Sequence, residues 1–139
     1  MRQAHHTLEV HTRGRGMHVV THEVARWLEA VGAAEGLLTL FIQHTSASLL
    51  VQENADPAVQ ADLDRFFSRL VKDGDSLFLH DAEGPDDMPA HVRAALTQTQ
   101  LSIPVLRGKM ALGTWQGLYV FEHRTAPYLR KVVLHYLGS

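Results

Sequence analysis

Three histidines that stand among polar and acidic side chains could together bind a metal ion. His44 begins a polar stretch after an apolar run, His80 ends a second short apolar run, and His91 lies in a predicted helix further along the chain. Imidazole is the commonest metal ligand in proteins, and three imidazoles leave a coordination position open for water or substrate. We therefore predict a metal site at these residues; the alternative is that histidines so far apart in sequence are unrelated.

A carboxylate accompanies the third histidine. Asp87 precedes His91 by four residues, so both side chains project from one face of the predicted helix. This carboxylate could orient a metal ligand or act as a base. The simpler alternative is that Asp86 and Asp87 only cap the helix and complement its dipole.

Further polar side chains lie where a predicted strand ends and a helix begins. Thr45 and Ser48 follow an apolar strand, and Asn54 precedes a helix. Side chains at the rigid end of a strand are well placed to hydrogen-bond a substrate. An ordinary Ser/Thr turn explains the first two residues without any function.

A segment bracketed by glycines, 113–117, holds two more candidate side chains. Thr114 and Gln116 could donate hydrogen bonds to a ligand that approaches the backbone at the glycines. The alternative is a tight turn between strands in which Trp115 closes the core.

Two arginines lie where the last predicted strands meet. Arg124 follows the strand 118–122, and Arg130 opens the strand 130–137. Pairing of these strands would place both guanidinium groups at one end of the sheet, where they could bind a phosphate. The default alternative is a solvated sheet edge.

The patterns of apolar residues predict an α+β fold in which a mainly antiparallel sheet carries about three helices. Thr21 and Asp56 are predicted N-caps, and Pro57 takes the first helical position after Asp56. Strand runs with few crossover helices favour antiparallel pairing. The predicted strands are 6–12, 17–20, 37–43, 47–52, 76–80, 101–106, 118–122 and 130–137, and the predicted helices are 21–31, 56–70 and one that begins at 86.

Composition narrows the class of protein. The chain has 139 residues, 45% of them hydrophobic, which predicts a single globular domain over residues 1–139. The formal net charge of −2 argues against nucleic acid as a partner. Because there is no cysteine, disulfides, thiolate catalysis and zinc–thiolate sites are excluded. Neither a signal peptide nor a membrane-spanning stretch is recognisable, so we expect a cytoplasmic protein without a membrane partner.

Five stretches, in order along the chain, carry a family resemblance: Gln43-His44-Thr45-Ser46-Ala47-Ser48-Leu49, Glu53-Asn54-x-Asp56-Pro57, His80-Asp81-x-Glu83-Gly84-x-Asp86-Asp87-Met88-Pro89-x-His91, Gly113-Thr114-Trp115-Gln116-Gly117 and Glu122-His123-Arg124. They resemble the YjbQ family, which is also called the secondary thiamine-phosphate synthase family. The resemblance extends along nearly the whole chain and is loosest through about Val31.

The resemblance implies a compact α+β fold that assembles as a homotrimer, with a metal site at His44, His80 and His91 near a subunit interface. It also implies thiamine-phosphate synthase activity, in which a thiazole phosphate displaces pyrophosphate from a pyrimidine methyl pyrophosphate. The residues then expected to bind substrate or act in catalysis are Thr45, Ser48, Asn54, Asp87, Thr114, Gln116, Arg124 and Arg130.

The expected function is therefore that of a metal-dependent enzyme acting on a small phosphorylated substrate. Imidazole ligands favour a zinc-like divalent ion, whereas a pyrophosphate substrate could bring magnesium, which prefers oxygen ligands. Two alternatives stay open. One is a metal-dependent hydrolase, and the other is a trimer that binds a small ligand without converting it.

Overall fold

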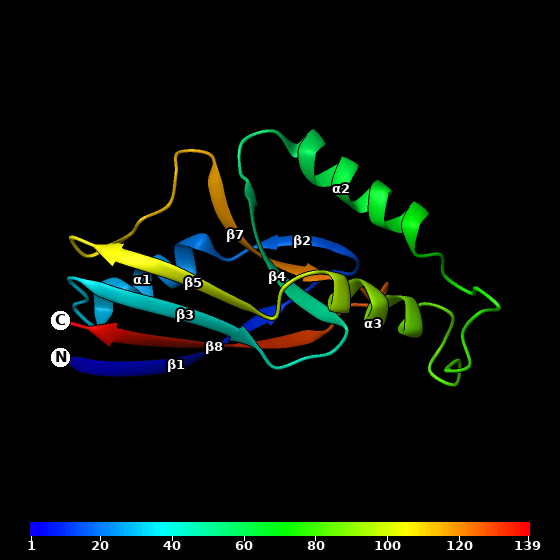
Figure 1. Ribbon diagram of the computed structural model, residues 1–139, viewed down its shortest axis with the longest axis horizontal. Coiled ribbons are helices and arrows are strands. Elements are labelled where there is room, and N and C mark those ends of the chain that lie inside the picture. Colours follow the sequence, from blue (N-terminus) through cyan, green and yellow to red (C-terminus); the bar gives the residue numbers. More distant parts are fainter.

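Eight strands and three helices follow one another along residues 1–139, all of which the computed structural model describes (Figure 1). The strands pair antiparallel and form two curled sheets, which confirms the predicted α+β class with three helices. In chain order the elements are β1 (Arg2–His11), β2 (Gly16–Val19), α1 (Thr21–Ala30), β3 (Gly36–Ile42), β4 (Ala47–Glu53), α2 (Pro57–Leu70), α3 (Asp87–Leu96), β5 (Gln100–Leu106), β6 (Lys109–Met110), β7 (Gln116–Glu122) and β8 (Leu129–Gly138).

The larger sheet has five strands in the order β1-β8-β3-β5-β6. β8 lies between β1 and β3, so that Tyr136 stands opposite Ala4 on one side and Leu38 on the other. Buried and exposed side chains alternate along β5 and β8, because successive residues of a strand point to opposite faces. The inward-facing side chains form the core, which includes Leu38, Leu40, Ile103, Val132 and Leu134.

The smaller sheet has three strands in the order β2-β7-β4. Its central strand, β7, is buried at every residue after the first. In the pairing with β4, Ala47 stands opposite Glu122 and Glu53 opposite Gln116. The two ends of β7, at Gln116 and Glu122, are therefore about 20 Å apart.

The helices differ in how they pack. α1 buries Val24 and Leu28 against the sheets. α2 begins as predicted, because Asp56 accepts the N–H of Ala58 at 2.9 Å and Pro57 is its first residue. No residue of α2 is fully buried, but the helix contacts the smaller sheet, where the ring of Phe67 packs edge to face against Phe121 of β7. None of the helices is long and apolar enough to cross a membrane.

The strand predicted over 76–80 does not form. Residues 71–86, between α2 and α3, contain turns, and no strand of either sheet pairs with them. Leu77 is 77% exposed and Leu79 is 97% exposed, whereas Phe78 between them is half-buried. Only Phe78 of this segment is shielded from water, and residues 76–77 form a turn, so no strand edge is available for pairing.

Two local expectations are also wrong. Thr21 is not an N-cap; it is the first residue of α1, and its hydroxyl accepts the backbone N–H of Leu118 at 2.9 Å. The alternative in which Trp115 closes the core fails, because this side chain is 62% exposed. The turn itself is present, since the N–H of Gln116 donates to the carbonyl of Gly113 at 3.1 Å.

Candidate functional site

Two histidines and an aspartate meet at the start of α3. Asp87 and His91 lie one turn apart on this helix, and His80 reaches them from the segment that precedes it. Oδ2 of Asp87 is 2.7 Å from Nε2 of His80 and 3.3 Å from Nε2 of His91. One potential ligand atom from each residue lies within 4.8 Å of the other two. We call these three residues the His80–Asp87–His91 cluster.

The cluster is closed on its acidic side and open on its histidine side. The side chain of Asp87 is 3% exposed, whereas those of His80 and His91 are 48% and 32% exposed. A hollow of ≈ 430 Å³ adjoins His80 and is lined by residues of the segment 74–85 and by the start of α3. A small molecule can therefore reach the histidines but not the far side of the carboxylate.

The surroundings of His91 show which of its ring nitrogens is free. Nδ1 lies 3.1 Å from the backbone carbonyl oxygen of Thr45. A carbonyl only accepts hydrogen bonds, so Nδ1 carries the proton. Nε2 then faces the carboxylate of Asp87 across 3.3 Å. Two lone pairs at this distance repel unless a second proton or a metal ion lies between them, so the donor set fits a cation at this point.

Arg124 holds the acidic side of the cluster. Its Nη1 is 2.9 Å from Oδ1 of Asp87, its Nε donates to Oδ2 of Asp86 at 3.0 Å, and its Nη2 donates to the carbonyl of Glu83 at 3.0 Å. Burial alone would raise the pKa of Asp87, but the hydrogen bond from His80 and the charge of Arg124 outweigh it and lower that pKa. Asp87 is therefore ionised, and Arg124 is occupied rather than free for a phosphate.

Asp86 ties the start of α3 to the loop after β7. It stands at the N-cap position, yet its side chain makes no capping hydrogen bond. Its Oδ2 instead accepts from Arg124 and from both the N–H and the hydroxyl of Thr125, at 3.0 and 3.2 Å. Burial would raise the pKa of Asp86, but these hydrogen bonds lower it to about 2. The capping role expected for Asp86 is thus replaced by an ion pair between elements.

His44 lies outside the cluster. Its Nε2 accepts the backbone N–H of Lys131 at 2.8 Å, and its Nδ1 is 3.4 Å from Nη1 of Arg130. Burial, followed by the nearby charge of Arg130, lowers the pKa of His44. Within one chain, the structure brings two of the three predicted histidines together, and an aspartate takes the third place.

Arg130 is buried in an ion pair. Its Nε donates to Oε1 of Glu122 at 2.8 Å, its Nη2 bonds the other carboxylate oxygen of Glu122, and the same Nη2 donates to the hydroxyl of Ser46 at 3.0 Å. The guanidinium also lies 4.7 Å from the centre of the Tyr128 ring. Breaking such a pair leaves an uncompensated buried charge. β7 and β8 lie in different sheets, so the strand pairing considered from the sequence does not form. The ion pair of Arg130 with Glu122 connects these two strands instead.

The predicted residues at the start of β7 lie far from the cluster. Asn54 donates to the carbonyl of Gln116 at 3.3 Å, and the side chain of Gln116 accepts the N–H of Gly113 at 2.8 Å. Thr114 belongs to the same turn. The length of β7 separates this group from Arg124 by about 20 Å. The structure does not bring Asn54, Thr114 or Gln116 to the candidate site.

A buried serine–histidine pair, not foreseen from the sequence, lies between β4 and β7. The hydroxyl of Ser48 is 2.8 Å from Nε2 of His123 and accepts from the hydroxyl of Thr97 at 2.6 Å. Both Ser48 and His123 are fully buried. Burial, and then the charge of Arg93, lowers the pKa of His123 to about 3, so its ring is neutral. Ser48 therefore lies in the interior of the chain. The only sequence signal for this pair was the alternation along the strand, which places His123 on the opposite face from Glu122 and Arg124.

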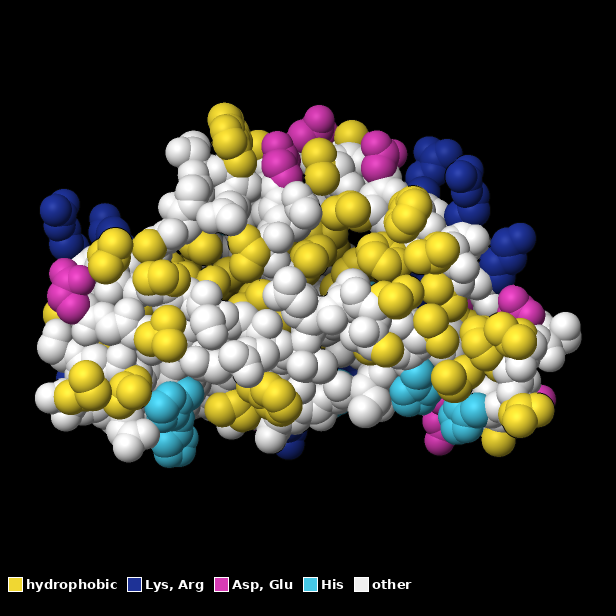
Figure 2. Space-filling model, in the orientation of Figure 1, with side chains coloured by type: hydrophobic (Ala, Val, Ile, Leu, Met, Phe, Trp, Pro, Cys, Tyr) yellow, Lys and Arg dark blue, Asp and Glu magenta, His cyan; other side chains and the backbone are white.

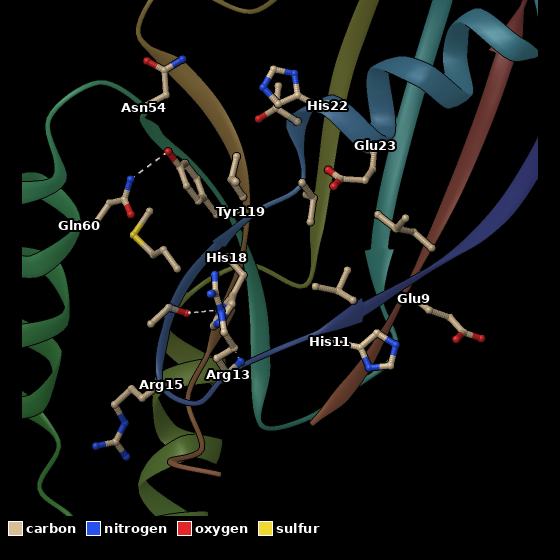
Figure 3. A pocket seen from close by; sticks show the side chains of 17 residues that line it. Glu9, His11, Arg13, Arg15, His18, His22, Glu23, Asn54, Gln60 and Tyr119 are labelled. Carbon is tan, nitrogen blue, oxygen red and sulfur yellow. Dashed lines mark hydrogen bonds between the residues drawn. The ribbon is translucent and has the colours of Figure 1, made fainter. Parts of the chain in front are cut away.

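A larger hollow than the one beside His80 lies elsewhere. A groove of ≈ 730 Å³ runs between β1, β2 and the start of α1 (Figure 3). On one wall Gln60 donates to the hydroxyl of Tyr119 at 3.1 Å, and this hydroxyl donates to the carbonyl of Glu53. No residue of the His80–Asp87–His91 cluster lines the groove. The cluster is the candidate site because of its chemistry, not because of the size of the hollow beside it.

Both sequence and fold match a known family. The family model described as UPF0047 protein YjbQ-like matches residues 6–139. The chain belongs to this family. The UPF0047 protein sll1880 of Synechocystis is 44% identical over 138 residues, which cover 99% of this chain and 94% of that protein. The UPF0047 protein YjbQ of Escherichia coli O157:H7 is 43% identical over 134 residues, 96% of each chain.

Crystal structures of similar proteins share the fold of this YjbQ-like chain. The hypothetical protein APE1520 from Aeropyrum pernix K1 superposes with a TM-score of 0.85 at 32% identity and covers 100% of both chains. The conserved hypothetical protein TT1486 from Thermus thermophilus gives a TM-score of 0.84 at 33% identity, over 94% of this chain and 98% of that one. The resemblance read from the sequence is thus confirmed along nearly the whole chain.

Proposed function

We propose that this YjbQ-family protein is a metal-dependent enzyme whose centre is the His80–Asp87–His91 cluster. The observation that carries the proposal is Nε2 of His91, which faces a buried carboxylate while Nδ1 holds the ring proton. Two imidazoles and a carboxylate suit zinc and similar transition ions, and they leave coordination positions open. When bound, such an ion would supply Lewis-acid activation of a substrate or of water.

The protein's own groups orient this centre. The carbonyl of Thr45 sets the direction of the His91 ring, and Arg124 holds one oxygen of Asp87 so that the other faces the histidines. Outer contacts of this kind typically fix ligand orientation and basicity. His80 is the most exposed member of the cluster, and its Nε2 lies 2.7 Å from Oδ2 of Asp87. It therefore marks the side from which a substrate in the adjoining hollow would reach the centre.

The substrate that we propose is a small phosphorylated molecule. Thiamine-phosphate synthesis is the specific case that follows from the family resemblance, and pyrophosphate is its leaving group. Loss of pyrophosphate requires positive charge close to the departing oxygens. Magnesium could accompany such a substrate through its oxygens, separately from the imidazole ligands.

A hydrolase is the second candidate, and the state of two arginines favours it. Arg124 is bonded to Asp86 and Asp87, and Arg130 is bonded to Glu122, so neither guanidinium in this chain is free for a pyrophosphate. Hydrolysis of a less charged ester needs less positive charge at the leaving group.

Turnover assays separate these candidates. With metal-loaded protein, a synthase releases pyrophosphate from the pyrimidine substrate only when the thiazole phosphate is present, whereas a hydrolase releases product in water alone. His91→Ala should abolish either activity while the fold remains. Full turnover by His91→Ala would exclude this centre. Tight binding with no product over hours would instead identify a non-catalytic small-ligand-binding protein.

We also propose that the chain forms a homotrimer. Phe66 and Leu70 on α2 are each 57% exposed, and Leu77 and Leu79 are exposed further still. Monomeric proteins rarely leave large apolar patches in water, so these side chains support an assembly. The weakly acidic, cysteine-free composition supports a cytoplasmic protein with neither nucleic acid nor membrane as a partner.

A further inference from the structure

The groove between β1, β2 and the start of α1 differs from the face of the molecule that carries α2 and α3. Figure 2 shows that hydrophobic side chains gather on that face and that charged side chains lie mainly at its rim. The groove instead combines two arginines, three histidines and two glutamates with apolar residues of β1 and β2 (Figure 3). Its volume of ≈ 730 Å³ is that of a small-molecule site, in which a few polar groups are placed around an apolar hollow.

A rigid turn holds Arg13 at one end of the groove. The turn contains Gly14 and Gly16, whose φ angles of 114° and 134° are strained for any other residue. A Cβ on Gly14 would also lie 2.8 Å from the carbonyl oxygen of Thr125. The ring of His18 closes the turn, because its Nε2 accepts the backbone N–H of Arg13 at 3.0 Å and its Nδ1 lies 3.2 Å from the carbonyl oxygen of Gly16. The backbone that carries Arg13 is thus fixed before a ligand arrives.

The guanidinium group of Arg13 is exposed and pairs with no carboxylate of the chain. Its neighbour Arg15 differs, because it binds the carboxylate of Asp73 at 3.0 Å and the carbonyl of His123. Both arginines lie at the same end of the groove (Figure 3). A free guanidinium binds a phosphate group through two parallel N–H bonds. This end of the groove is therefore suited to a phosphate.

The other end of the groove offers two free acceptors. Nε2 of Gln60 donates to the hydroxyl of Tyr119 at 3.1 Å, and Nδ2 of Asn54 donates to the carbonyl of Gln116 at 3.3 Å. These bonds use the amide nitrogens and leave Oε1 of Gln60 and Oδ1 of Asn54 without a partner in the chain. An amide oxygen only accepts hydrogen bonds, so a ligand group bound here must donate them.

The length of β2 sets the distance between the two ends. β2 begins at Gly16, beside the turn that carries Arg13, and its last residue, Val19, stands opposite Tyr119. Three residue steps along a strand span about 10 Å. The wall between the ends is apolar at Met17 and Val19. A ligand that reaches both ends therefore needs an apolar or aromatic body between its phosphate and its donor group.

We propose that this groove is a second binding site, for a small phosphomonoester with N–H donors about 10 Å from its phosphate. The phosphate pairs with Arg13, the body of the ligand lies along β2, and its N–H groups donate to Gln60 and Asn54. A nucleoside monophosphate with an exocyclic amino group has this arrangement of groups. No residue of the His80–Asp87–His91 cluster lines the groove, so this site is separate from the proposed metal centre.

Calorimetric titration of AMP into the full chain tests the site. Adenosine, which lacks the phosphate, and inorganic phosphate, which lacks the rest, should each bind more weakly than AMP. Arg13→Gln should weaken AMP binding about 10-fold, the loss of one charge-assisted contact, and leave adenosine binding unchanged. Arg26→Gln is the matched control, because Arg26 is an exposed arginine of α1 outside the groove. It should bind AMP as the wild type does.

A variant without the metal centre shows which site AMP occupies. His91→Ala protein, treated with a chelator, should bind AMP as tightly as the wild type, whereas Gln60→Leu should weaken AMP and adenosine alike. The groove site would be overturned by a wild type that does not bind AMP, by equal losses in Arg13→Gln and Arg26→Gln, or by binding that depends on His91. Each of these results would leave the metal content of the wild type, and thus the proposed centre, to be judged separately.

Discussion

At the scale of single residues, buried titratable groups make the stability of this protein depend on pH. His123 has a pKa lowered from 6.5 to about 3 by burial and by Arg93 and other arginines. Between these values the unfolded chain takes up a proton that the folded chain refuses. The free energy of unfolding should therefore fall as the pH decreases from 6.5 towards 3, with up to about 1.4 kcal/mol per pH unit from this residue.

His123→Gln isolates this contribution, because glutamine keeps hydrogen-bonding capacity and does not titrate. Denaturant unfolding at a series of pH values should give a flatter curve for the variant than for the wild type below pH 6.5. Parallel curves over that range would show that His123 is protonated in the folded protein and is not the buried neutral group described above.

Arg124 was predicted to bind a phosphate, but in the structure it is paired with Asp86 and Asp87. It bridges Asp86, Asp87 and the carbonyl of Glu83, which a lysine cannot do with one ammonium group. Arg124→Lys should therefore weaken binding of Zn²⁺ to chelator-treated protein about 10- to 100-fold, the usual effect of losing an outer contact. The exposed Arg26→Lys on α1 serves as the control in calorimetric titrations, and equal affinities in both variants would refute the orienting role.

Only part of the candidate site could be predicted from the sequence, because some of its contacts form between distant segments. The four-residue spacing of Asp87 and His91 placed both side chains on one helix face, which is a local property. The position of His44 depends on the backbone of Lys131, 87 residues away, and that pairing exists only after β8 has joined the sheet. Arg124 and Arg130 were predicted to bind a phosphate, but each is paired with a carboxylate from another segment of the chain, which the sequence does not place beside it.

At the scale of elements, the pairing of β3 with β8 leaves no room for a side chain at Gly36. Gly36 stands opposite Gly138, and a Cβ on Gly36 would lie 2.3 Å from the carbonyl oxygen of Leu137 and 2.7 Å from Cα of Gly138. Because backbone atoms cannot yield without disturbing the sheet, Gly36→Ala should lower the free energy of unfolding by about 3 kcal/mol or more.

Gly113→Ala is the matched control for that substitution. Its added Cβ would meet nothing closer than 3.4 Å, at the side chain of Gln116. Its effect should therefore stay within about 0.5 kcal/mol. Urea unfolding of the two variants beside the wild type measures the difference, and similar stabilities for both would contradict the tight register of β3 and β8.

Helices and strands were predicted correctly where the residues that define them are neighbours in the sequence. Asp56 and Pro57 marked the start of α2 correctly, since a cap and a fixed φ act within one turn. The pattern over 76–80 described a strand-like segment, yet a strand also needs a neighbouring edge, and the chain supplies none there. Thr21 behaves similarly, because its hydroxyl accepts a hydrogen bond from β7 rather than from its own helix.

At the scale of the whole molecule, the apolar side chains outside the core point to assembly. We expect light scattering to give about three times the chain mass of 15.5 kDa. The double substitution Leu77→Asp, Leu79→Asp should shift the protein towards the monomer, because charged side chains oppose burial at a contact. The control is Leu37→Asp, because this exposed leucine lies on β3 of the larger sheet. A wild-type protein that stays monomeric at high concentration would exclude the trimer.

The most direct test of the central claim is metal content, measured by elemental mass spectrometry on untagged protein. The wild type should carry about one transition-metal ion per chain, and His80→Ala, Asp87→Ala and His91→Ala should each lose it. His44→Ala should keep it, because the ring of His44 is bound to Lys131 and lies beside Arg130. A wild-type protein that takes up no metal after reloading, or a His44→Ala protein that loses its metal as fully as His91→Ala, would contradict this account.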